Sequence, residues 1–117
     1  MNAQEKLIYK VCGEADWEEA LAKGEFSGAP VDLSDGFIHF STGEQLAETL
    51  RRHFAGKSEL MLVAVDPGAL GPLLRWEPSR GGALFPHLYG ALPLSAVRWQ
   101  KPLSADEKGE FVLPEGL

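Results

Sequence analysis

The chain has 117 residues, 44% of them apolar and 24% charged, values typical of one globular domain over residues 1–117. Eleven basic and seventeen acidic residues give a net charge of −6. This balance counts against a nucleic-acid partner, because binding to a phosphate backbone needs a basic surface. The single cysteine excludes an intrachain disulfide and a cysteine-rich zinc site. No apolar run is long enough for a membrane span and the first six residues are polar, so we expect a cytoplasmic protein.

The first third of the chain predicts a strand, a helix and a long loop. Residues 7–12 are rich in β-branched and aromatic side chains and are too short for a helix, so they predict a strand. Asp16 can cap a short helix, which Lys23 and Gly24 would end. Residues 24–36 are rich in turn-forming residues and predict a loop.

A second strand, helix and strand are predicted in the middle of the chain. Residues 37–41 are aromatic and β-branched, which favours one continuous strand. Thr42 is suited to cap a helix over residues 43–54, with Gln45 at the third position as a capping box requires. Residues 60–65 are nearly all apolar and predict a central strand covered on both faces.

The second half of the chain predicts strands and loops. Strands are expected over residues 73–77, 83–90 and 96–100, and the tail, residues 103–117, is expected to be loosely held. Two main helices in the N-terminal half followed by several strands indicate a small α+β domain.

The first candidate site lies around His39. In a continuous strand, His39 and Ser41 would point to the same face, with Thr42 opening a helix beside them. Free backbone N–H groups at the start of a helix bind phosphate or carboxylate. The alternative is a half-buried histidine bonded to a loop carbonyl, with Ser41 and Thr42 acting as caps.

The second candidate site is the segment 75–90, which is dense in titratable and aromatic side chains between glycines and prolines. Such a composition is typical of a binding loop. Arg80 beside two glycines could bind phosphate through its forked guanidinium, and His87 and Tyr89 alternate onto one strand face. The alternative is an irregular hairpin with a surface pair between Arg80 and Glu77, which would contribute little.

Three segments resemble a small bacterial family, domain of unknown function 952, over about residues 7–102. The segments that carry the resemblance are Ile8-Tyr9-Lys10-Val11, Asp35-Gly36-Phe37-Ile38-His39-Phe40-Ser41-Thr42 and Phe85-Pro86-His87-Leu88-Tyr89-Gly90. That family is in turn similar in fold to the ADP-ribosylating transferases and to the NAD-dependent RNA 2′-phosphotransferases. The resemblance therefore implies the ADP-ribosylation fold, with mixed or antiparallel strands in two small sheets around a cleft.

The resemblance also implies a site for NAD or a related adenine nucleotide. No metal is expected, because nothing in the spacing of the three histidines, at positions 39, 53 and 87, favours a zinc site. Lys10 stands where those enzymes hold NAD with a histidine or arginine, and Glu77 is the nearest acid to their catalytic glutamate, although it lies early for that role. We expect His39 and Glu77 to be catalytic. The residues expected to bind the ligand are Lys10, Ser41, Thr42, Arg80, His87 and Tyr89.

Two classes of function follow from these expectations. In the first, a cleft binds a phosphate-bearing, nucleotide-like small molecule and the protein is a transferase or hydrolase that acts on it. In the second, the domain keeps the fold without the NAD chemistry, and is a non-catalytic binding or protein-interaction module. Lys10 and the early position of Glu77 favour the second class.

Overall fold

The computed structural model describes residues 6–115 and 117, with the side chain of Arg80 left out of the description. The α-helices in this part of the chain are α1 (Glu14–Lys23), α2 (Pro30–Asp35) and α3 (Gly43–His53). The strands are β1 (Ile8–Gly13), β2 (Glu25–Phe26), β3 (Ile38–His39), β4 (Ser41–Thr42), β5 (Leu60–Val65), β6 (Leu74–Pro78), β7 (Leu84–Leu88), β8 (Leu92–Pro93) and β9 (Val97–Leu103). The α+β class and the two main N-terminal helices are therefore confirmed.

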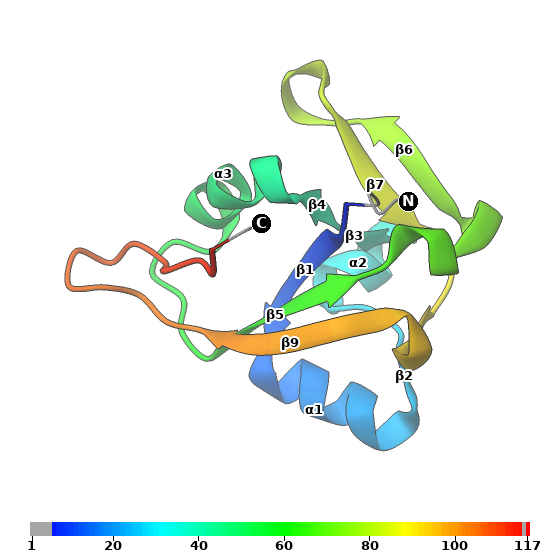
Figure 1. Cartoon of the computed structure of the whole chain (residues 1–117), viewed down its shortest axis with the longest axis horizontal. Coiled ribbons are helices and arrows are strands. Elements are labelled where there is room, and N and C mark those ends of the chain that lie inside the picture. The colour runs from blue at the N-terminus through cyan, green and yellow to red at the C-terminus, as the bar shows by residue number, and fades with distance from the viewer. Residues whose placement is uncertain (1–5, 116) are drawn as a thin grey trace.

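The strands form three antiparallel sheets in the described residues, where two were expected. The largest has the order β4-β1-β5-β9, a second has the order β3-β7-β6, and β2 pairs with β8. In Figure 1 the β6–β7 hairpin extends away from the large sheet, while α1 and α3 lie on different sides of it. The cleft expected between the sheets stays a prediction.

The large sheet has a core on each face because its strands alternate apolar side chains in both directions. Tyr9 and Val11 of β1 pack with Leu46 and Leu50 of α3. The side chains of β1 and β5 that point the other way pack against α1, β3 and β7. The central position and double-sided burial predicted for residues 60–65 are confirmed, since β5 lies between β1 and β9 and Leu62 to Val65 are completely buried.

The prediction of one strand over residues 37–41 is wrong. The chain leaves one sheet and enters another at Phe40: His39 pairs with His87 of β7, whereas Ser41 pairs with Tyr9 of β1. The burial of Phe40 in the core between these sheets fixes the bend. Local alternation of side chains does not reveal such a change of partner.

The predicted helix starts have opposite outcomes. Thr42 accepts a hydrogen bond from the backbone N–H of Gln45, and the Gln45 side chain accepts one from the N–H of Thr42, so the predicted capping box is confirmed. Asp16 is not a cap, because α1 begins two residues earlier, after Gly13. Its carboxylate lies in the first turn of α1, where it still interacts favourably with the helix dipole.

The prediction of a loop over residues 24–36 is also wrong, because this segment contains β2 and the short helix α2. Pro30 occupies the first helical position of α2, where its missing N–H costs nothing. Gly36 ends α2 with a φ of 90°, which a glycine adopts without strain.

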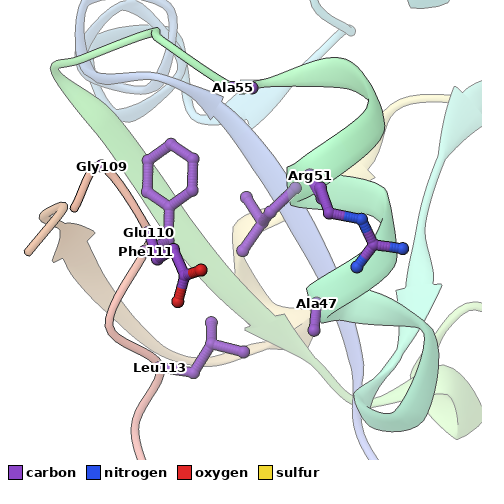
Figure 2. A pocket seen from close by; sticks show the side chains of 8 residues that line it. Ala47, Arg51, Ala55, Gly109, Glu110, Phe111 and Leu113 are labelled. Carbon is purple, nitrogen blue, oxygen red and sulfur yellow. The ribbon is translucent and has the colours of Figure 1, made fainter.

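The end of the tail packs near α3, whereas residues 104–110 are exposed, and the expectation that the tail is loosely held stays a prediction. Phe111, Leu113 and Leu117 pack against the core beneath α3, and Ala105 forms a β-bridge with Phe111. Between the tail and α3 lies a cavity of about 240 Å³, into which Phe111 and Leu113 face in Figure 2. None of the predicted site residues lines it.

Candidate functional site

A buried carboxylate, Asp32, organises the candidate site. Asp32 is 2% exposed and lies in α2. Its Oδ2 accepts a hydrogen bond from the backbone N–H of Ala29 at 2.8 Å, and its Oδ1 accepts one from the backbone N–H of His39 at 3.1 Å. The first bond caps the start of α2, and the second holds α2 against the end of β3.

Asp32 also pairs with two side chains, Lys10 and His39. Lys10 Nζ lies 2.8 Å from Asp32 Oδ2, and His39 Nδ1 lies 2.6 Å from Asp32 Oδ1. Burial raises the pKa of Asp32, but the hydrogen bonds from His39 and Lys10 and the charge of Lys10 outweigh it and lower the pKa to about 2. Lys10 is only 4% exposed, so its charge also needs a buried partner. The ion pair with Asp32 compensates both charges.

His39 carries a second carboxylate contact on its other ring nitrogen. Nε2 lies 2.9 Å from Asp35 Oδ2, on the solvent side of a side chain that is 34% exposed. Each ring nitrogen of His39 therefore lies within hydrogen-bond distance of its own carboxylate and donates to it when that nitrogen carries a proton. The arrangement places the imidazole ring between Asp32 and Asp35.

Three nitrogen-bearing side chains form a row across the sheet β3-β7-β6. His39 pairs with His87, and His87 pairs with Arg75 on its other side. Directly paired residues of antiparallel strands point to the same face, so the three side chains share one side of this sheet. The His39 and His87 rings are 5.6 Å apart between centroids.

Glu77 binds two neighbours on the same face. Its Oε1 accepts hydrogen bonds from His87 Nδ1 at 2.7 Å and from the Tyr89 hydroxyl at 2.8 Å. These bonds, the one from His87 first, lower the pKa of Glu77 and keep it ionised. The bond to Glu77 in turn raises the pKa of Tyr89.

Phe37 packs among these polar groups. Its ring stacks on His87 with centroids 4.3 Å apart, and lies 4.6 Å from the ring of His39 and 5.2 Å from that of Tyr89. The Arg75 guanidinium carbon lies 5.2 Å from the Tyr89 ring centroid. We call this set the histidine face; its members are Phe37, His39, Arg75, Glu77, His87 and Tyr89.

The structure brings together four of the eight predicted site residues, His39, Glu77, His87 and Tyr89, and links Lys10 to them through Asp32. Their roles in binding or catalysis stay predictions. The prediction for Arg80 falls on a side chain outside the described residues.

Ser41 and Thr42 lie elsewhere, contrary to the expectation that Ser41 and His39 share a face. Ser41 is buried and its hydroxyl lies 2.9 Å from that of Thr49 in α3. It pairs with Tyr9, so it faces α3, whereas Lys10 points to the opposite side of β1. The Thr42 hydroxyl is used in capping α3.

Sequence reasoning missed Asp32 and Asp35 because it treated their segment as a loop. A proline followed two residues later by an aspartate, with a glycine after the next turn, matches the start and end of a short helix and could have revealed α2. Phe37 and Arg75 lie within segments that the sequence singled out, residues 37–41 and 75–90, but their positions in the histidine face depend on strand pairing.

The described residues contain no group of three or more histidine, cysteine, aspartate or glutamate side chains arranged to hold a metal ion. Within the same part of the chain, no helix is both long and apolar enough to cross a membrane.

A family model described as "Protein of unknown function (DUF952)" matches residues 11–100. The chain belongs to the DUF952 family. The match includes β1 from Val11 onwards, α2 and all of the sheet β3-β7-β6, so the histidine face lies within the part shared with the family.

Solved structures of protein CC0527 from Caulobacter crescentus are similar to this DUF952 chain. The X-ray structure has 49% sequence identity and a TM-score of 0.87, and the match covers 91% of this chain and 93% of that one. The solution NMR structure has 50% identity and a TM-score of 0.80, with coverage of 89% and 90%. None of the curated proteins gives a significant match to this chain.

Proposed function

We propose that this DUF952 protein binds a small nucleotide-like ligand that carries phosphate, on the histidine face. The observation that carries the proposal is the row of Arg75, His87 and His39 in register across three strands. Within the described residues no carboxylate forms an ion pair with Arg75, so its guanidinium is available to a phosphate.

The neighbouring side chains suit the other parts of a nucleotide. Tyr89 is 36% exposed, and its ring beside Phe37 offers an aromatic surface to a base. Glu77 is ionised and one third exposed on the same face, so it can accept a hydrogen bond from a ribose hydroxyl. Phosphate, ribose and base would thus each have a partner of matching chemistry.

The same groups support a transferase or hydrolase reaction within this proposal. His39 is held at Nδ1 by a buried carboxylate, which orients the ring. Its Nε2 could then give a proton to a leaving group. Glu77 could stabilise positive charge that develops at an anomeric carbon, the role that the resemblance to NAD-dependent transferases and the ADP-ribosylation fold implies.

The alternative is a binding module without catalysis, and two observations favour it. Lys10, at the position expected to contact NAD, uses its ammonium in a buried pair with Asp32. Glu77 uses Oε1 for two internal hydrogen bonds. Both groups are therefore used in contacts within the protein, and a ligand would have to compete with those contacts.

The binding test is thermal denaturation and calorimetric titration with NAD, ADP-ribose and AMP, with adenosine as the ligand lacking phosphate. A ligand at a hundred times its dissociation constant adds about 2.7 kcal/mol to the free energy of unfolding and raises Tm by several degrees. We expect Arg75→Gln to weaken binding about 10- to 100-fold, because a charge-assisted hydrogen bond contributes about 1.5–3 kcal/mol. Arg51→Gln removes an exposed positive charge from α3, beside the cavity under the tail and not on the histidine face, and should leave the affinity unchanged.

Absence of any shift with all three nucleotides would contradict the proposal. Catalysis is tested separately, by measuring nicotinamide released from NAD in the presence of the protein. Release that His39→Gln abolishes would favour the enzyme, and binding without release would favour the non-catalytic module.

A further inference from the structure

We propose that Asp35 occupies the anion-binding position of His39, and that an anionic group of the ligand displaces it from Nε2. This inference rests on the proposed function and deepens it, because it names the group on the protein that the ligand must replace. Asp35 would thus act as an internal competitor that selects ligands by charge.

The two carboxylates on His39 are held very differently. Asp32 has a side chain 1% exposed and also pairs with Lys10 and two backbone N–H groups. Asp35 has a side chain 45% exposed, and among the described residues His39 is its one side-chain partner. An ion pair that is open to water contributes little, so Asp35 can leave Nε2 at small cost while Asp32 stays.

The position of Asp35 in the fold allows this movement. It is the last residue of α2, and Gly36, which follows it at a φ of 90°, ends the helix. The carboxylate can therefore rotate away from His39 without breaking the contacts that Asp32 makes from the middle of α2. Nε2 then faces solvent, where the protonated ring can donate a hydrogen bond to an anion.

The vacated position suits phosphate better than a neutral group. A phosphate monoester brings more charge and more acceptor oxygens than one carboxylate, and the exposed Arg75 lies on the same face, beyond the buried His87. A neutral nucleoside would interact with His39 more weakly than the Asp35 carboxylate does, so the contact between Asp35 and His39 would stay in place. The ligand class is therefore a phosphate ester or another small anion of high charge density.

The test compares wild type with Asp35→Asn, using inorganic phosphate as the probe. The amide keeps the shape of Asp35 and removes its charge, so phosphate should bind about three- to tenfold more tightly to the variant. The imidazole signals of His39 in NMR spectra should shift on titration in both proteins. Glu18→Gln removes one charge from the exposed side of α1 and should change the affinity less than twofold.

His39→Gln combined with Asp35→Asn tests whether the His39 side chain is required, because it should abolish the gain. Equal phosphate affinity of wild type and Asp35→Asn, or an equal gain in Glu18→Gln, would overturn the inference. The inference would also be overturned if neither wild type nor any of the variants bound phosphate.

The outcome is separable from that of the proposed function. If wild type binds nucleotides and Asp35→Asn binds phosphate no more tightly, the proposed function stands and this inference is wrong. If Asp35→Asn binds phosphate more tightly but neither protein binds a nucleotide, this inference stands and the proposed function is wrong.

Discussion

Asp32 is the residue on which the buried polar contacts of the site converge. It satisfies two backbone N–H groups and pairs with the side chains of Lys10 and His39. Removing one partner of such a buried pair leaves a charge without compensation, which costs about 3–5 kcal/mol. We therefore expect single substitutions of Lys10 or Asp32 to be much more destabilising than removal of both charges together.

The lowered pKa of Asp32 predicts a loss of stability in acid. A carboxyl group with a pKa of about 2 in the folded state and 3.8 as its ordinary value stabilises the fold when ionised. That contribution is complete above pH 4 and is lost as the pH falls through 2, and it amounts to about 2 kcal/mol. Urea denaturation of wild type between pH 2 and 5 measures it.

The matched control for the acid prediction is the double variant Lys10→Met with Asp32→Asn, which has neither charge. The free energy of unfolding of this variant should lack the part of the pH dependence that Asp32 supplies. If wild type and the double variant lose stability in parallel on acidification, Asp32 does not have the assigned role.

At the scale of elements, the short helix α2 positions both carboxylates that contact His39, those of Asp32 and Asp35. Its six residues are too few to form a stable helix alone, so tertiary contacts must hold it. Those contacts are the buried Asp32 and the close approach of Gly28, where an added Cβ would lie 2.9 Å from the Asp32 Cβ. The loop before α2 is thus part of the site's support.

A glycine can be required by a positive φ or by lack of space for a Cβ, and Gly28 and Gly24 distinguish these two reasons. Both have a positive φ, 126° and 93°, but an added Cβ at Gly24 has nothing within 4 Å. We expect Gly24→Ala to cost about 1 kcal/mol from backbone strain, and Gly28→Ala about 3 kcal/mol because it also pushes on Asp32. Chemical denaturation measures both, and equal losses would show that the approach to Asp32 is unimportant.

At the scale of the whole molecule, the large sheet has a separate core on each face. The face under α3 and the tail contains no residue of the histidine face, and the opposite face supports α2 and the sheet β3-β7-β6. Both cores share β1 and β5, so the two sides should unfold together. Cys12 lies in β1, 2% exposed, on the side that supports the site.

The buried thiol of Cys12 reports this cooperativity. Burial raises its pKa to about 12, so the native protein has almost no reactive thiolate. We expect a thiol reagent to label the native chain far more slowly than free cysteine, at a rate that rises with urea in step with global unfolding. Labelling that is fast at low urea would mean that β1 opens locally and would contradict a single cooperative unit.

Elements specified by neighbouring residues were predictable from the sequence. The apolar run of β5 specifies a strand covered on both faces, and Thr42 with Gln45 starts α3, because these signals act within a few residues. The crowding of His87, Tyr89 and Glu77 in one short segment likewise indicated where polar and aromatic groups would meet. These features depend on local chain geometry, which the sequence itself determines.

The partners of each element were decided by tertiary structure. The change of sheet at Phe40 sends Ser41 to α3 and leaves His39 beside His87, although the two residues are only two apart in sequence. The contact of Asp32 with Lys10 joins positions 22 residues apart, through a helix too short to predict by periodicity. Strand pairing and burial of charge depend on residues distant along the chain, and their free energies appear only once the whole core has formed.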